Sequence, residues 1–253
     1  MAELKDLKVG EYPKWTIPSQ SVMEGVTIMN DDEIRGAVIG MILGDGHIGL
    51  SGRSTNGHID FAHCAKQRDY ATWKAGILEN LTSVRITDGV SHCKGKAYPH
   101  VRVLTKTHPL YTHLWKRFYH NGRKTIDEFL MSQLTPMGLA IWYQDDGTLE
   151  NRERFLTPTI QTNWFNVLEN WLMSKSLADK FHIEFRVQKL NAKYLKLTIR
   201  RKDRENFYDI VRPYIQPCML HKIRDDGHRS TTGSVRNIEP RDDLNLVATS
   251  GAC

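Results

Sequence analysis

Two carboxylates, Asp45 and Asp146, each end a mostly apolar segment and are followed by glycine. The segments read GAVIGMILGDGH over residues 36–47 and GLAIWYQDDGTL over residues 138–149. If the two segments are helices packed on each other, their last acids lie side by side. Two close carboxylates repel, and the C-terminal end of a helix adds partial negative charge, so this arrangement favours a divalent cation such as Mg²⁺. Mg²⁺ held by carboxylates can activate water in phosphodiester hydrolysis.

A lysine follows each acid at a similar distance along the chain. Lys124 in GRKTI follows Asp45, and Lys222 in MLHKI follows Asp146. Either lysine could polarise the attacking water or stabilise developing charge. Gln161 ends a predicted strand and could order water near the second acid, or it could be a cap or surface group. One Asp-Gly pair is ordinary turn chemistry, but two at matched places with matched lysines favour a site.

The elements that must position these residues form an internal repeat. Helices are expected over about 31–43, 67–81, 107–118, 136–145, 163–172 and 203–212. Strands are expected over about 58–63, 84–88, 98–105, 148–150, 155–161, 182–188 and 193–200. The order is αββαββα in each half, although the first strand of the first half is weakly marked. We expect an α+β fold with pseudo-twofold symmetry and two antiparallel sheets.

The predicted division of the chain follows this repeat. An N-terminal arm covers 1–30, the first repeat 31–130, the second repeat 131–225, and a polar C-terminal tail 226–253. Gly36, Gly40 and Gly44 recur every four residues, which lets two helix backbones approach closely. A set of tryptophans at helical spacing is expected in the core: Trp73, Trp115, Trp142 and Trp171.

Composition limits the partners and the compartment. The net charge of +6 and the isoelectric point of about 9.1 favour a polyanionic partner. The four cysteines are far apart and form no CxxC pair, so free thiols in a reducing compartment are expected. We find neither a run of about 18 apolar residues nor a signal-peptide core. A soluble intracellular protein is therefore expected, in an organelle or in a bacterial or phage-infected cytoplasm.

The segments VIGMILGDG (38–46) and LAIWYQDDG (139–147) resemble the two signature helices of the LAGLIDADG homing endonucleases. The longer stretch LTPMGLAIWYQDDG is similar to the second motif of the monomeric, two-motif branch. The likeness covers roughly residues 31–225. It implies a monomeric endonuclease that cuts both strands of a long DNA site with two overlapping metal-dependent centres and promotes intron mobility.

The resemblance also implies roles for single residues. The last acid of each motif carries over to Asp45 and Asp146 as ligands of Mg²⁺, with Mn²⁺ able to substitute, and the late basic residue carries over to the two lysines. The backbone carbonyls of Gly44 and Asp145 are implied as further metal contacts. The Asp145 side chain occupies a position where the family varies, so it is not expected to be a ligand.

The two sheets are expected to form a saddle over double-stranded DNA, each lying along the major groove. Together they would cover about twenty base pairs, and because the halves differ in sequence the target need not be palindromic. Candidate base readers are Arg53, His58, Arg102, Arg152, Arg154, Arg186, Lys196 and Arg200, and candidate phosphate contacts are Arg201, Lys202 and Arg204.

Two other functions fit the same residues. A maturase would keep the fold and bind intron RNA to assist splicing. A DNA-binding regulator would keep the fold and use its acids structurally. The presence of both acids and both lysines favours an intact nuclease, and cleavage and splicing assays separate the three.

Overall fold

Two halves of the chain repeat one order of helices and strands. The computed structural model describes residues 29–50, 52, 54–152, 155–191 and 194–223. The first half contains α1 (Asp31–Leu43), β1 (His47–Leu50), β2 (Gly57–Cys64), α2 (Arg68–Glu79), β3 (Val84–Cys93), β4 (Lys96–Thr105) and α3 (Pro109–Phe118). The second contains α5 (Pro136–Asp146), β7 (Gly147–Arg152), β8 (Phe155–Gln161), α6 (Val167–Phe181), β9 (Phe185–Lys189), β10 (Leu195–Ile199) and α7 (Arg204–Val211). The predicted αββαββα duplication is confirmed.

Short elements join and extend the repeats. A two-residue hairpin, β5 (Tyr119–His120) with β6 (Arg123–Lys124), and the helix α4 (Glu128–Gln133) connect the halves, and the sequence did not predict either. Four 3₁₀ segments complete the described part: η1 (Ala65–Gln67), η2 (Arg201–Asp203), η3 (Arg212–Tyr214) and η4 (Pro217–Lys222). The strand β6 carries Lys124, and the segment η4 carries Lys222.

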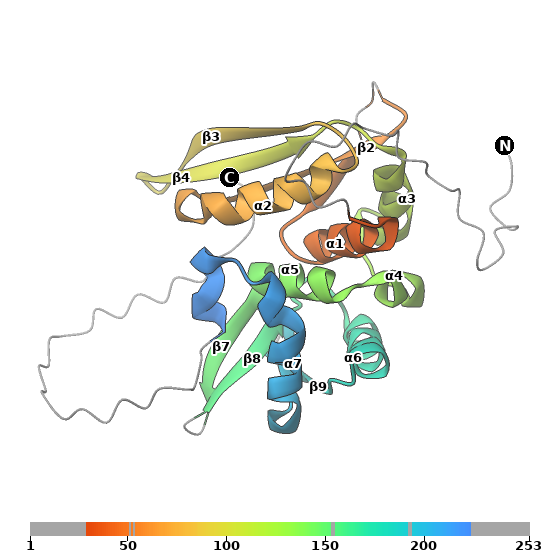
Figure 1. Cartoon of the computed structure of the whole chain (residues 1–253), viewed down its shortest axis with the longest axis vertical. Coiled ribbons are helices and arrows are strands. Elements are labelled where there is room, and N and C mark those ends of the chain that lie inside the picture. The colour runs from red at the N-terminus through yellow and green to blue at the C-terminus, as the bar shows by residue number, and fades with distance from the viewer. Residues whose placement is uncertain (1–28, 51, 53, 153–154, 192–193, 224–253) are drawn as a thin grey trace, which may run out of the picture.

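The two sheets have the same topology. Their strand orders are β1-β2-β4-β3 and β7-β8-β10-β9, with antiparallel pairing throughout. The register pairs His47 with Asp60 in the first sheet and Thr148 with Thr159 in the second. Figure 1 shows the pair α1 and α5 between the sheet containing β3 and β4 and the sheet containing β7 and β8. The weakly marked first strand is β1, which begins after Asp45 and Gly46.

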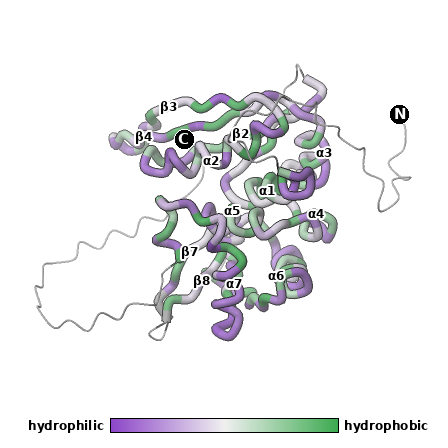
Figure 2. Tube along the Cα trace, in the orientation of Figure 1, coloured by the Kyte–Doolittle hydropathy of each residue, from purple (hydrophilic) through white to green (hydrophobic). Residues whose placement is uncertain are grey.

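The central helices α1 and α5 begin at clear sequence signals. The side chain of Asn30 accepts a hydrogen bond from the Glu33 amide at 2.8 Å, and Thr135 accepts one from the Gly138 amide at 3.2 Å. From residue 36 to residue 43, α1 is buried without interruption. A helix that is apolar all round belongs inside the molecule, and Figure 2 shows hydrophobic residues along both central helices.

The backbones of α1 and α5 touch. A Cβ atom added to Gly40 would lie 2.1 Å from the Gly138 carbonyl oxygen, and one added to Gly138 would lie 2.1 Å from the Gly36 carbonyl oxygen. Because no larger residue fits at these positions, the glycine face of α1 is the surface that contacts α5. The prediction of two closely packed signature helices is confirmed.

The tryptophan prediction is partly wrong. Trp142 is fully buried, and Trp73 and Trp115 pack partly buried against the core, but Trp171 is 64% exposed. The helix α6 turns Met173 and Leu177 inward. Successive residues of a helix are about 100° apart, so Trp171, two positions before Met173, faces away from the core.

Several expectations fall on residues that the structure does not describe. The tail 226–253 lies outside the described residues, as does the N-terminal arm apart from residues 29 and 30. Among the described helices, none is both long enough and apolar enough to cross a lipid bilayer.

Candidate active site

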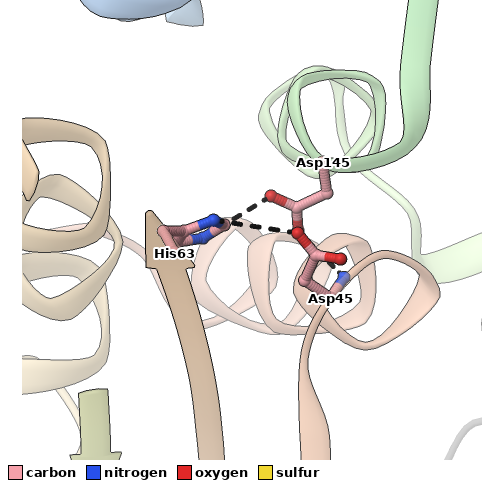
Figure 3. Close-up of side chains that lie close together, drawn as sticks. All are labelled: Asp45, His63 and Asp145. Carbon is pink, nitrogen blue, oxygen red and sulfur yellow. Dashed lines mark hydrogen bonds and ion pairs between the residues drawn. The ribbon is translucent and has the colours of Figure 1, made fainter. Parts of the chain in front are cut away.

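The acidic ends of α1 and α5 meet at one point of the molecule. Asp45 follows Gly44, the C-cap of α1, and Asp145 and Asp146 are the last two residues of α5. The backbone amide of Asp45 donates a hydrogen bond to Oδ2 of Asp145 at 3.2 Å. Figure 3 shows Asp45 and Asp145 reaching toward each other from the two helices. Three acids from two distant parts of the sequence therefore share one site.

The carboxylates of Asp45 and Asp146 are under electrostatic stress. Burial, followed by repulsion from Asp145, raises the pKa of Asp45 to about 6. Burial, followed by repulsion from Asp45 and Asp145, raises the pKa of Asp146 well above its ordinary value. Both shifts report negative charge that is removed from water without sufficient compensation. A divalent cation bound between these acids would relieve both effects.

The predicted lysines lie at this site and hold the ends of the two helices. Nζ of Lys124 donates to the carbonyl oxygen of Ile42 at 2.6 Å and lies 3.4 Å from that of Gly44. Nζ of Lys222 donates to the carbonyl oxygens of Gln144 and Asp145, the latter at 3.2 Å. Burial lowers the pKa of both lysines, while the nearby acids oppose that shift.

The available donors suit a hard cation. Asp45 and Asp146 offer carboxylate oxygens, and the carbonyls of Gly44 and Asp145 lie beside the lysine ammonium groups. Oxygen donors of this kind are the ligands preferred by Mg²⁺ and accepted by Mn²⁺. At the end of β8, the buried Oε1 of Gln161 has no hydrogen-bond partner among the described residues. An unpartnered buried oxygen is consistent with the predicted water-ordering role.

A buried polar network beneath the site was not predicted. The Asp145 side chain is fully buried and accepts hydrogen bonds from Lys74 Nζ at 3.0 and 2.9 Å. The hydroxyl of Tyr70 donates to Asp145 at 2.7 Å. Nζ of Lys74 also lies 3.1 Å from Nε2 of His63. The signal in the sequence was Lys74 itself, a charged residue among the inward-facing positions of the helix α2.

This network fixes the charge of its members. Burial alone would raise the pKa of Asp145, but Lys74, His63 and Tyr70 bring it below the ordinary value, so Asp145 is ionised. Burial, followed by the charge of Lys74, lowers the pKa of His63 to about 4. The imidazole is therefore neutral near pH 7. Its 3.7 Å approach to Asp45 is a polar contact rather than an ion pair.

Asp45, His63 and Asp145 could also be considered as metal ligands, since one ligand atom from each lies within 4.8 Å of the others. Lys74 already occupies both oxygens of Asp145 and faces Nε2 of His63. A cation at this point would have to displace a buried ammonium group. The donors at Asp45 and Asp146 fit a divalent metal better, because no described lysine spans those two carboxylates.

The predicted DNA contacts are distributed over both sheets. Arg102 pairs with Asp60, Lys196 is buried against Glu150, and Arg200 and Lys202 both lie 2.7 Å from Glu184. His58 is half-buried, while Arg186 and Arg201 are exposed and Arg204 is half-buried. Arg53, Arg154 and the side chain of Arg152 lie outside the described residues. Their role in DNA binding stays a prediction.

Comparison with known proteins adds to this geometry. Residues 35–207 match the profile of the LAGLIDADG DNA endonuclease family. The chain is 26% identical over 250 residues to Protein RecA of Mycobacterium gastri, which covers 94% of this chain and 56% of the relative. It is 32% identical over 124 residues to the probable intron-encoded DNA endonuclease 3 of Mycosarcoma maydis, which covers 47% of this chain and 89% of the relative. It is 26% identical over 198 residues to the cytochrome b mRNA maturase bI2 of Saccharomyces cerevisiae (74% and 46%).

The fold is also similar to a solved structure, the homing endonuclease I-WcaI bound to its DNA recognition sequence. The TM-score is 0.67 at 25% identity, with 77% of this chain and 87% of the other covered. The chain spans about half the length of the mycobacterial relatives that it matches.

Proposed function

Because the chain belongs to the LAGLIDADG DNA endonuclease family, we propose that it is a site-specific homing endonuclease. It makes a double-strand break in double-stranded DNA, acts as a monomer and requires Mg²⁺ or Mn²⁺. Its target is non-palindromic and about twenty base pairs long, since each sheet follows about one turn of duplex. The break promotes the mobility of the intron or element that encodes it.

One observation carries this proposal. Two acids with raised pKa values lie at the ends of two helices whose backbones touch, and a half-buried lysine holds the end of each helix. Such an arrangement destabilises the metal-free protein, and a structural role for the acids gives no reason to keep it. A divalent cation held by Asp45 and Asp146 would remove the repulsion and would supply positive charge for phosphodiester hydrolysis.

Each group of residues in the site has a separate proposed role. A bound metal would supply charge neutralisation at the phosphate and activation of water. Asp45 and Asp146 would hold it, with the carbonyls of Gly44 and Asp145 as further donors. Lys124 fixes the carbonyls at the end of α1 and Lys222 those at the end of α5, so both keep the donor set in place and add positive charge near the reacting phosphate.

The proposal is tested by selection of cut ends from a random duplex library in Mg²⁺, followed by sequencing. The selected target is then used to compare the wild type with Asp45→Asn and Asp146→Asn. We expect both variants to bind the duplex and to lose the double-strand break by a factor of at least about 10³. Asp179→Asn, an exposed acid on α6, serves as the matched control and should cut normally. Normal cutting of both strands by Asp45→Asn or Asp146→Asn would exclude the assigned site.

A maturase function is the second candidate. It is supported by the similarity to the cytochrome b mRNA maturase bI2, which extends over 74% of this chain. The partner would then be an intron RNA in addition to DNA. Splicing of the host intron in the presence of the wild type and of Asp45→Asn separates the two functions, because splicing without cleavage chemistry should survive the loss of this acid.

A further inference from the structure

The two halves of the site differ at one matched pair of positions. Gly44 and Asp145 each stand directly before a candidate metal-binding acid. A Cβ atom added to Gly44 would lie 2.6 Å from Cβ and 2.5 Å from Oδ2 of Asp145. Only one of the two positions can therefore carry a side chain. The pseudo-twofold symmetry of the fold is broken where the chemistry takes place.

The support for this side chain is also confined to one half. The helix α2 buries Tyr70 and Lys74 four residues apart, and both contact Asp145. The matching helix α6 buries Glu169 and Met173 at the same spacing. Glu169 caps its own helix and pairs with Arg123, and Met173 carries no charge. Within the described part of the second half, no lysine lies at the position of Lys74.

The network reaches the first acid by two routes. Oδ2 of Asp145 accepts the backbone N–H of Asp45, which fixes the chain where that carboxylate begins. Nε2 of His63 faces the ammonium group of Lys74, so the neutral ring carries its hydrogen on Nδ1, the atom 3.7 Å from Oδ2 of Asp45. Among the described residues, no member of this network forms a hydrogen bond with the side chain of Asp146.

We propose that Tyr70, Lys74 and Asp145 are positioning residues that orient Asp45 and not Asp146, so that the two DNA strands are cut by centres of unequal preorganisation. This inference rests on the proposed endonuclease function and deepens it. A catalytic group that is held in place pays less reorganisation in the transition state than one that is free to move. One strand is therefore cut first, and disturbing the network slows that strand more than the other.

Three substitutions disturb the network from different elements. Tyr70→Phe removes one hydrogen bond to the ionised Asp145, Lys74→Met installs the residue found at the matching position of α6, and Gly44→Ala pushes the Asp145 carboxylate away. Single-turnover cleavage of the selected duplex, labelled on each strand in turn, gives a rate for each strand. We expect Tyr70→Phe to slow the first-cut strand roughly tenfold, because it removes a hydrogen bond to a charged group.

All three variants should slow the same strand, with unchanged affinity for the duplex. Leu177→Ala in the core of α6 is the control for lost stability and should leave the ratio of the two strand rates unchanged. Equal slowing of both strands, or a bias toward different strands among the three variants, would overturn the proposal.

A second readout does not depend on cleavage. Mn²⁺ binding to the free protein, followed by the electron paramagnetic resonance signal of unbound Mn²⁺, reports on Asp45 directly. Tyr70→Phe, which changes no charge, should weaken Mn²⁺ binding several-fold, while Leu177→Ala should not. If the wild type cuts no duplex, the proposed function fails, and the positioning role is then decided by this measurement alone. Equal Mn²⁺ affinity of Tyr70→Phe and the wild type would exclude it.

Discussion

Asp45 stands in a place where a carboxylate is useful to a metal and unfavourable without one. Its pKa of about 6 lies above the ordinary value of 3.8 because burial and Asp145 disfavour the ionised form. Between these two pH values the folded protein binds more protons than the unfolded chain. The free energy of unfolding contributed by this group therefore falls as the pH rises from about 3.8 to 6 and stays low above 6.

Replacing Asp45 with asparagine should remove the loss of stability that its ionised side chain causes. In the presence of EDTA at pH 7, Asp45→Asn is expected to raise the free energy of unfolding by about 1 kcal/mol, a figure kept small because the side chain is more than one-third exposed. This increase in the free energy of unfolding should disappear toward pH 4, where Asp45 is protonated in the folded wild type. Urea unfolding at both pH values measures the difference, and a loss of stability at pH 7 would contradict the assignment.

Metal binding should depend on pH through the same group. Protons and Mn²⁺ compete for Asp45, so the apparent affinity for Mn²⁺ is expected to fall as the pH drops below about 6. Calorimetric titration at pH 7.5 and pH 5 checks this, with roughly a tenfold weaker affinity expected at the lower value for one competing proton. In Asp45→Asn the residual pH dependence should be smaller, and an undiminished dependence would place the competition elsewhere.

At the level of helices, the contact between α1 and α5 has almost no tolerance for added atoms. Gly40→Ala places its Cβ 2.1 Å from a carbonyl oxygen of the partner helix, so the helices must separate. We expect a loss of at least about 3 kcal/mol in the free energy of unfolding, as for severe overpacking in a core. Urea or thermal unfolding measures the loss.

Gly76→Ala is the matched control for this substitution. Gly76 lies within α2, is exposed, and has no atom within 4 Å of the added Cβ. Alanine is a better helix former, so this variant should be more stable by about 0.5–1 kcal/mol. If Gly40→Ala were as well tolerated as Gly76→Ala, the close approach of the two central helices would be disproved.

Sequence patterns predicted those features that depend on local signals. The glycine spacing of α1 and the alternation of the strands predicted the repeat and the meeting of both acids at one point. The β3–β4 hairpin runs further than predicted, because polar residues near its turn at Lys94-Gly95 extend it beyond the core. Hydrophobic periodicity does not mark such an extension.

The buried network escaped prediction for a different reason. Lys74 and Asp145 come from different halves, and although Lys74 lies at an inward-facing position of α2, nothing in the sequence identifies Asp145 as its partner. Lys74 and Asp145 meet only because α2 lies next to α5 in the folded protein. A contact between two helices leaves no periodic pattern in the sequence of either helix. The placement of Trp171 was predicted wrongly because the first turn of α6 buries the polar side chains of Glu169 and Asn170 on the same face as Met173, which leaves Trp171 exposed.

For the whole molecule, the proposed function assigns each of the two sheets to one half of the DNA target. Arg102 lies on β4 of the first sheet and Arg186 on β9 of the second. We expect Arg102→Ala and Arg186→Ala to relax base preference in opposite halves of the target, by about 1–3 kcal/mol at the affected positions. Sequencing of cut ends from a target library with single-base changes measures this. Lys175→Ala on α6 is the control, and relaxation of the same half by both arginine variants would refute the saddle arrangement.

The steric exclusion between Gly44 and Asp145 limits how such a chain can be rebuilt. A symmetric enzyme made from two copies of the second half would force two Asp145 side chains into the space of one. Two copies of the first half would leave both buried Lys74 ammonium groups without a counter-ion. Chimeras that exchange halves with relatives will assemble only when a small residue lies opposite the acid where the two halves meet. This pair of positions therefore decides which halves can be combined to change the DNA target.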